Sequence, residues 1–396
     1  MKAINTFRIN YTLRQHTPII HFQHDHYGAT LRATEVKPKL DRFLRDKMPT
    51  MSNLKEHAHL ADKVRRAMKN KQSLYKMAFE ASAESNYYVP VSQKINKDEL
   101  KAITQKQKIS VVGMNNTTYF ANEEATKDLP QKVDKLDKLR VALQAKGDNA
   151  YINGHIICFD KPLRECIEKV LPYFFAYENF GTRQNKGFGC FEVMEVRDKE
   201  ITHTHEELLR PLYTIIYRKR IREDSQRNAS QWQKTTKNDY DLLKRGAPKK
   251  TSKLKKHFAK DEIGWEKDWL KGKAAGNRNL IDDNYRFIRA VLGLPGMYDI
   301  QPGKTKISVK VKDTDTSEHA IDRFRSPITF KVYDDVFYLC ANEFTKDEKV
   351  ILNRQFAFEI EGKGTHTLAT PATFNLTDFL NEALGNRRES GYDKIS

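Results

Sequence analysis

The sequence has few cysteines. Only four occur in 396 residues, Cys158, Cys166, Cys190 and Cys340. None forms a Cys-x-x-Cys pair, and no nearby histidine completes a zinc-binding spacing. Scattered cysteines in a chain of this length are typical of reduced core thiols, which favours a cytoplasmic location.

Membrane and export signals are also missing. The first residues, MKAINTFRINY, contain no apolar segment of the kind a signal peptide needs. No stretch of 18 apolar residues is present, so no transmembrane helix is expected. We find no basic amphipathic helix with a continuous apolar face, which argues against a membrane partner.

Signatures of common hydrolases are absent. The sequence contains no Gly-x-x-x-x-Gly-Lys-Ser/Thr, no Gly-x-Ser-x-Gly and no His-Glu-x-x-His. Residues 179–190, named here the glycine-rich segment, are not a P-loop because no Gly-Lys-Ser/Thr ends them. The sequence therefore gives no indication of a nucleotide site or a hydrolase, and we expect no cofactor and no bound metal.

Positive charge is what the sequence has in excess. Its 70 Lys and Arg residues outnumber 52 Asp and Glu residues, giving a formal net charge of +18. Such a charge attracts polyanions, and neutralised phosphates release counterions on binding. A surplus of solubilising lysines is the plain alternative. Residues 218–260 hold 15 Lys and Arg against 4 Asp and Glu, which indicates a basic helical insertion or a mobile basic segment.

The order of predicted elements favours an α+β chain of two domains. An alternating apolar pattern predicts a strand over 4–13, followed by a helix over 29–44. Pro38 limits where that helix can start, and Pro172 should kink or break a later one. The other expected elements are strands at 109–113, 151–159, 191–196, 306–311, 327–333 and 336–339 and helices at 162–177, 284–294 and 377–384.

The glycine-rich segment is the strongest candidate site. Its glycines let the backbone approach a phosphate, and exposed N–H groups form anion-binding nests. Phe188, which lies between two glycines, could stack on a base or anchor the loop. An ordinary turn-rich connection is the alternative. The candidate RNA-binding residues here are Gly181, Thr182, Arg183, Lys186, Gly187, Phe188 and Gly189.

Two further basic groups are candidates for phosphate contact. The first alternates with apolar positions in the predicted helix near residue 40, where a solvated helix face is the alternative. The second, in which two arginines flank Phe324, suits stacking plus phosphate contact, and a charge cluster at a strand edge is the alternative. The residues are Arg32, Lys37, Lys39 and Arg42 in the first group, and Arg323 and Arg325 in the second.

Histidines crowd the N-terminal region at His16, His21, His24 and His26. One of them could act as the general acid or base of an RNA-cleaving site. Three, together with Asp25, could bind a metal, but their spacing fits no familiar pattern. Histidines that lie at the surface or contact RNA are the favoured interpretation.

At these residues the sequence resembles the RAMP superfamily of CRISPR proteins. Members carry a Gly-rich loop before a late strand, matched here by residues 181–189. The sequence is most similar to the first RAMP subunit of Cmr-type (type III-B) complexes. That family has Thr-Pro after its first strand, an L-R-x-x-x-[IV]-K helix entry and a later R-x-x-S-P-[LI]. The matches are Thr17-Pro18, Leu31–Lys37 and Arg323–Ile328.

The resemblance implies two ferredoxin-like (RRM-like) domains, here expected at residues 1–200 and 201–396, with the basic helical insertion at about 215–280. It also implies a non-catalytic subunit of an antiviral type III effector complex. Its partners would be crRNA, target RNA and other RAMP subunits.

Two other functions stay open. One is a crRNA-processing endoribonuclease of the same superfamily that uses an N-terminal histidine. The other is a standalone RNA-binding scaffold protein.

Overall fold

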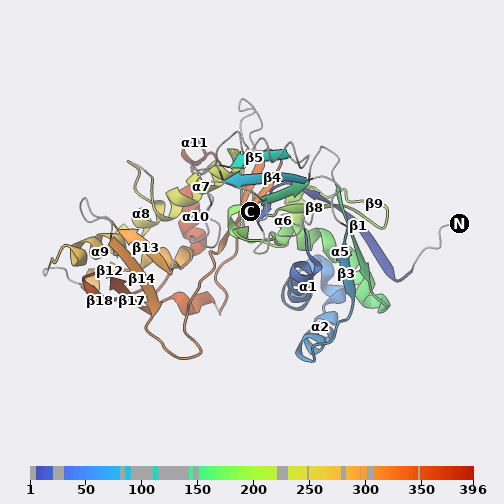
Figure 1. Ribbon diagram of the computed structural model, residues 1–396, viewed down its shortest axis with the longest axis horizontal. Coiled ribbons are helices and arrows are strands. Elements are labelled where there is room, and N and C mark those ends of the chain that lie inside the picture. Colours follow the sequence, from blue (N-terminus) through green and yellow to red (C-terminus); the bar gives the residue numbers. More distant parts are fainter. Residues whose placement is uncertain are drawn as a thin grey trace, which may run out of the picture.

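A computed structural model describes residues 6–20, 31–80, 85–90, 110–114, 142–145, 151–220, 231–247, 249–277, 282–294, 296–300, 307–346 and 348–396. The molecule is elongated, with the N-terminal half at one end and a lobe containing α8 (Lys253–Ala259) and α9 (Glu266–Ala274) at the other (Figure 1). No described helix is long and apolar enough to span a bilayer. All four cysteines are buried and free, as expected of core thiols.

The N-terminal half is built on an antiparallel five-stranded sheet in the order β3-β7-β1-β8-β9. Alternate residues of β1 (Ile9, Tyr11 and Leu13) are buried, so only one face of this strand meets the core. The strands are β1 (Arg8–Gln15), β3 (Lys76–Phe79), β7 (Tyr151–Ile157), β8 (Phe191–Val196) and β9 (Lys199–Glu200).

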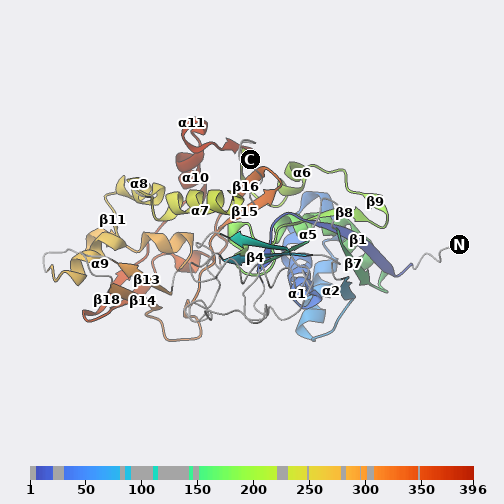
Figure 2. The same ribbon diagram turned by 45° about the horizontal axis from the view of Figure 1, so that its top comes forward.

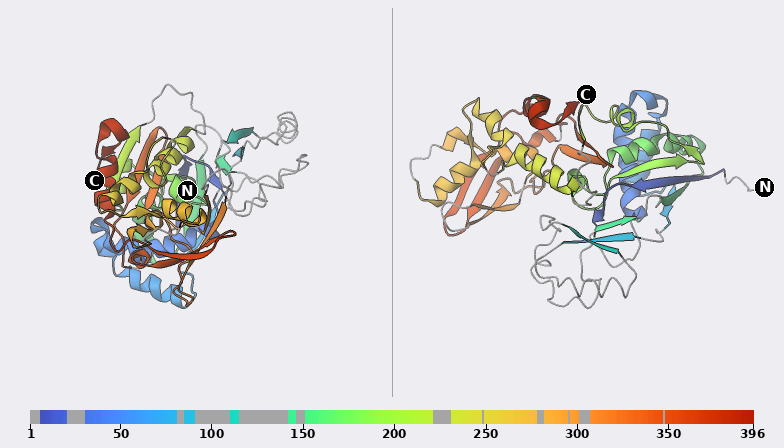
Figure 3. Two further views of the ribbon diagram at one scale, coloured as in Figure 1. Left: turned by 90° about the vertical axis from the view of Figure 1, so that its left-hand side faces the viewer. Right: turned by 90° about the horizontal axis from the view of Figure 1, so that it is seen from above.

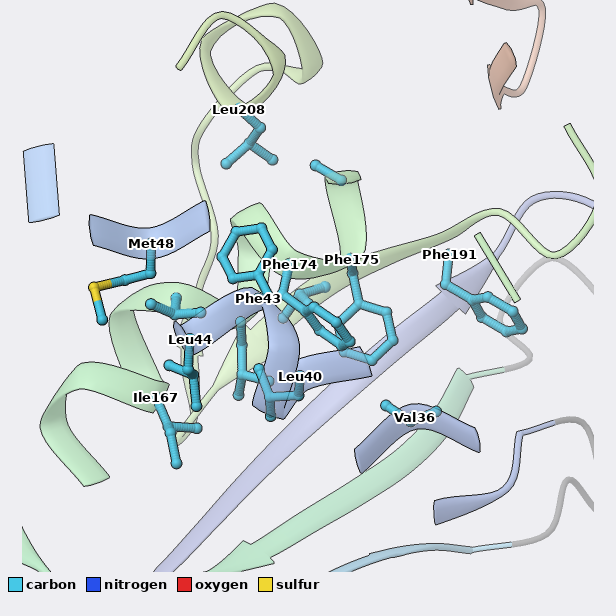
Figure 4. Packing of buried hydrophobic residues seen from close by; sticks show 14 of the residues in the cluster. Val36, Leu40, Phe43, Leu44, Met48, Ile167, Phe174, Phe175, Phe191 and Leu208 are labelled. Carbon is cyan, nitrogen blue, oxygen red and sulfur yellow. The ribbon is translucent and has the colours of Figure 1, made fainter. Parts of the chain in front are cut away.

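Apolar residues of α1 (Ala33–Arg42) and α5 (Lys161–Tyr177) form the core on that face (Figure 4). The expected break at Pro172 is wrong, because α5 continues through it. Burial of Phe174 and Phe175, about 1.5–3 kcal/mol each, offsets the roughly 3 kcal/mol that an interior proline costs. Pro38 likewise lies inside α1, where its missing N–H frees only the carbonyl of the exposed Thr34. Among the described residues of this half, two further α-helices are α2 (Leu60–Lys69) and α6 (His205–Leu209).

A small sheet in the order β2-β6-β4-β5 joins segments far apart in the sequence. Its β4 and β5 are parallel, whereas its other pairs are antiparallel. The strands are β2 (Ile19–Ile20), β4 (Ser85–Pro90), β5 (Ser110–Met114) and β6 (Ala142–Ala145).

The C-terminal half has its own antiparallel sheet, in the order β15-β16-β10-β19. Its strands are β10 (Ile215–Arg220), β15 (Ile328–Tyr333), β16 (Val336–Ala341) and β19 (Asp393–Lys394). The boundary of about 215 that we expected for the basic insertion is therefore too early in the sequence, because residues 215–220 form the core strand β10. The three basic residues 218–220 made this strand resemble the basic stretch that follows it. The preceding residues Ile215–Tyr217, however, are fully buried.

The other described segments of the C-terminal half form the lobe that contains α8 and α9, called the distal lobe, and the helices beside it. An antiparallel sheet in the order β13-β14-β17-β18 combines strands from either side of β15 and β16 in the sequence. Helix α7 lies between this lobe and β15 and β16 (Figures 2 and 3). The bounds are α7 (Gln231–Lys244), α8 (Lys253–Ala259), β11 (Gly264–Trp265), α9 (Glu266–Ala274), β12 (Tyr285–Arg286), β13 (Met297–Ile300), β14 (Ile307–Asp313), β17 (Gln355–Ile360), β18 (Gly364–Ala369), α10 (Leu376–Leu384) and α11 (Arg387–Ser390).

Candidate nucleic-acid interface

The glycine-rich segment lies where the two halves meet. Asn179 Nδ2 donates to the Phe330 carbonyl on β15 at 3.0 Å, and Asn185 Nδ2 donates to the Ser326 carbonyl at 2.6 Å. Arg325 Nε donates back to Asn185 Oδ1 at 2.9 Å. The glycine-rich segment is therefore held by the predicted Arg323–Arg325 group and by the strand β15 that follows it. Arg325 and its partner Asn185 are 140 residues apart in the sequence.

A buried lysine completes this contact. Lys331 on β15 is fully buried, and its Nζ donates to the Phe175 carbonyl at 3.2 Å and the Glu178 carbonyl at 2.7 Å. A third bond reaches Asn179 Oδ1 at 2.8 Å. Because all three acceptors lie at or just after the end of α5, this side chain fastens the C-terminal half to that helix end.

We expect Lys331 to make stability depend on pH. Burial lowers the pKa of Lys331 to about 8, so between that value and its unfolded pKa the unfolded chain binds more protons. The free energy of unfolding of wild type, relative to Lys331→Met, should therefore rise by about 1.5 kcal/mol between pH 8 and pH 9.5. Urea unfolding of both proteins at both pH values measures it. Burial raises the pKa of the thiols, so they act in the opposite direction, and comparing the two proteins removes the part of their effect that does not depend on Lys331. A constant difference between the two proteins would contradict the prediction.

The Thr17-Pro18 pair holds the other side of the segment. Thr17 Oγ1 donates to the Gly187 carbonyl at 2.7 Å and accepts from the Cys190 N–H at 2.9 Å. The Gly189 N–H donates to the Pro18 carbonyl at 2.8 Å. Thr17 is fully buried, so this pair builds the shape of the loop.

Helix α1 supports the segment from a third direction. Lys39 Nζ donates to the Asn179 carbonyl at 2.6 Å, and the Gly181 N–H donates to Glu35 Oε1 at 2.5 Å. Lys39 is 8% exposed, so a phosphate could reach it only if these contacts opened. Lys37 forms a 2.8 Å ion pair with Asp41.

The other predicted side chains of these groups differ in exposure. Arg42 and Arg323 are exposed, and Arg32 is half-buried. For these three and for Lys37, phosphate contact stays a prediction.

Phe188 anchors the loop in this structure. It is 1% exposed, and its ring meets that of Trp232 on α7 edge-on at 4.8 Å between centroids. Gly187 has a φ of +84°, and a Cβ there would lie 2.9 Å from Val332 Cγ2. Of the two roles predicted for Phe188, the structure supports anchoring.

These contacts leave a cleft of about 820 Å³ between the glycine-rich segment, α7 and the segments around residues 293 and 325. It gathers six cationic side chains and one carboxylate, Asp241. Gly181, Thr182 and Phe188 also line it. Such a hollow favours a polyanion. The cations are Arg183, Lys186, Lys237, Lys244, Arg245 and Arg325.

Two of these lysines are desolvated. Burial lowers the pKa of Lys186 well below its ordinary value and that of Lys244 to about 7. Lys244 Nζ donates to the Leu292 and Gly293 carbonyls at 3.1 and 2.5 Å. Lys186 Nζ lies over the Tyr240 ring without a hydrogen-bond acceptor among the described residues. An anion entering the cleft would favour the charged form of both amines.

Of the four N-terminal histidines, the structure describes one. His21, His24 and His26 lie outside the described residues, so their predicted role is untested. His16 follows β1 and its side chain is fully buried. It contacts Glu192, and no residue of this contact is among those that line the cleft.

Two family models together span most of the sequence. The Cmr1 N-terminal domain matches residues 6–247, and the Cmr1 C-terminal domain matches residues 249–392. The chain belongs to the Cmr1 family. The resemblance predicted from the residues is thereby confirmed at the level of the subunit family.

Two solved structures that are similar to this Cmr1-family chain are those of type III-B Cmr-beta complexes. A chain of the type III-B Cmr-beta complex bound to cognate target RNA, solved by cryo-EM, is 11% identical, with a TM-score of 0.42 over 95% of this chain and 98% of that one. A second, bound to cognate target RNA and AMPPnP in the presence of ssDNA, has the same identity and TM-score over 96% and 98%. No curated protein matches the sequence.

Sequence reasoning missed the α7 side of the cleft. Lys237, Tyr240, Lys244 and Arg245 fall within the basic stretch 218–260, but composition alone does not separate a cleft wall from an exposed surface. Part of this wall could have been found from the sequence. Lys237, Tyr240 and Lys244 are spaced three and four residues apart, which places them on one face of a helix.

Proposed function

We propose that this chain is a non-catalytic RNA-binding subunit of a type III-B effector complex. The observation that carries the proposal is the cleft, which brings six basic side chains from distant segments together in a member of the Cmr1 family. Four of them lie outside the pair of desolvated lysines, and a bound anion would favour the charged form of that pair as well. Phosphate neutralisation supplies much of the affinity in such a site. Its partners would be crRNA, target RNA and other RAMP subunits.

We further propose that both halves are ferredoxin-like. In the first, β8-β1-β7-β3 follows the order 4-1-3-2 when its strands are numbered along the chain. In the second, β19-β10-β16-β15 follows the same order. Helices α1 and α5 occupy the two crossover positions of the first half, and α7 and α10 those of the second. The distal lobe is then an elaboration of the second unit.

Incubation of the purified chain with labelled repeat-containing RNA tests the function. We expect binding, measured by fluorescence anisotropy, that weakens as salt rises from 50 to 200 mM, without RNA cleavage on a denaturing gel. Site-specific cleavage without added metal would favour the processing endoribonuclease instead. A His21→Ala/His24→Ala/His26→Ala variant would then show whether those histidines perform it.

Assembly distinguishes the third candidate. A subunit of an effector complex should co-purify with RAMP subunits and crRNA when a tagged copy is expressed from its native locus. Recovery of the tagged chain with RNA but without any RAMP subunit would support the standalone scaffold.

A further inference from the structure

A second polar cluster lies at the junction of β1, β8 and α6. His16 Nε2 is 2.9 Å from Glu192 Oε2, and His205 Nε2 is 2.7 Å from Glu192 Oε1. The His16–Glu192–His205 cluster, as it is called below, brings together residues up to 189 positions apart in the sequence. None of its three residues is among those that line the cleft.

The three side chains present a metal-binding donor set. One ligand atom from each residue can be chosen so that all three lie within 4.8 Å of one another. Zinc binds imidazole nitrogen and carboxylate oxygen at about 2.0–2.2 Å, so neighbouring ligands of a tetrahedral ion are roughly 3.3 Å apart. The two imidazole–carboxylate contacts, each to a different Glu192 oxygen, are shorter than this by about half an ångström, whereas the full set of three ligand atoms is bounded only at 4.8 Å. Side-chain rotations that open the first two contacts and close the set would therefore accompany binding.

The surroundings orient the donors as outer-shell groups do in metal sites. Asp334 Oδ1 lies 3.4 Å from His16 Nδ1, the ring nitrogen that faces away from Glu192. A carboxylate on this side of the ring would orient it so that Nε2 points toward Glu192, and a metal would take the place of the present Nε2–Glu192 contact. The His205 ring stacks on that of Tyr333, with centroids 3.9 Å apart and planes 7° from parallel.

Exposure differs across the cluster in a way that suits a bound ion. The side chain of His16 is fully buried, whereas those of Glu192 and His205 are 16% and 27% exposed. The buried nitrogen is shielded from competing water, and the partly exposed Glu192 and His205 give an ion a path of entry.

We propose that His16, Glu192 and His205 bind a divalent transition metal, with Zn²⁺ the best match to two imidazoles and a carboxylate. This replaces the expectation from sequence that no metal is bound. The ligands belong to the N-terminal half, but Asp334 and Tyr333 belong to the turn and strand of the C-terminal half. A bound ion therefore strengthens the contact between the two halves.

Metal content and affinity test the proposal. The purified full-length chain, stripped with a chelator and reloaded, should take up one equivalent of Zn²⁺, measured by competition with a chromophoric chelator. Co²⁺ in its place should give the visible absorption of a tetrahedral site. Zinc should also raise the Tm of wild type.

Matched variants assign the site. His205→Ala and Glu192→Gln should lose stoichiometric binding and the zinc-dependent rise in Tm. Asp334→Asn should weaken binding by ~10-fold, because it removes only the orienting carboxylate. His203→Ala removes an exposed histidine two residues from a ligand and should bind as wild type does.

The triple change His21→Ala/His24→Ala/His26→Ala excludes the other histidine-rich stretch as the site, and it should also retain binding. Absence of stoichiometric uptake by wild type would overturn the proposal, leaving a carboxylate held by two imidazoles. Undiminished uptake by His205→Ala would overturn it too, since the zinc would then lie elsewhere. Neither result bears on RNA binding by the cleft.

Discussion

Replacing Arg183, Arg245 and Arg325 together by alanine should lower the affinity for single-stranded RNA by on the order of 100-fold near 100 mM salt. These side chains line one cleft from three separate segments, so a bound RNA backbone meets all three. Each lost phosphate contact should also reduce the slope of log affinity against log salt by about 0.7 for a single strand. Anisotropy titrations at several salt concentrations measure both quantities.

The matched control removes the same charge elsewhere. Lys161, Lys260 and Lys312 have side chains that are 74%, 63% and 64% exposed and are not among the residues that line the cleft. Changing all three to alanine leaves the same net charge as the cleft variant, but should shift affinity only slightly. Equal losses in the two variants would mean that overall charge, and not this cleft, determines binding.

Changing Gly189 to alanine should destabilise the fold by more than about 4 kcal/mol. Its φ is +65°, and an added Cβ would lie 1.9 Å from the Phe180 carbonyl oxygen. That oxygen belongs to the backbone of the same segment. Because the Phe180 N–H also donates to the Gly189 carbonyl at 2.9 Å, the backbone at Phe180 cannot move away from Gly189 without losing this bond. The measurements are the Tm from thermal unfolding and the affinity for RNA, and we expect both to be much lower than in wild type.

Gly276 provides the comparison for that change. It has a similar φ of +75°, but nothing lies within 4 Å of an added Cβ. Gly276→Ala should therefore cost only the intrinsic left-handed strain, about 1–2 kcal/mol. A Gly189→Ala protein as stable as Gly276→Ala would show that the tight approach to Phe180 is absent in solution.

Local pattern was enough to predict several elements and the residues of one cleft wall. Alternation in β1, the helix around α5 and the final helix α10 all follow from the periodicity of apolar residues, since each buries one face. Two predictions were wrong, the helix break at Pro172 and the start of the basic insertion at residue 215, where β10 lies. In both places burial against distant residues outweighed a local signal, a helix-breaking ring in one and a run of cations in the other.

By itself, the sequence determined the family, the basic character and the importance of the Thr17-Pro18, α1 and Arg323–Ile328 motifs. Only the tertiary structure decided that all three converge on the glycine-rich segment, where Thr17, Lys39 and Asn185 hold its backbone. It also decided which cations line the cleft and which serve packing, as Lys331 does. The physical reason is that charge and propensity are properties of a residue, whereas burial and the partner it meets depend on chain segments far away in the sequence.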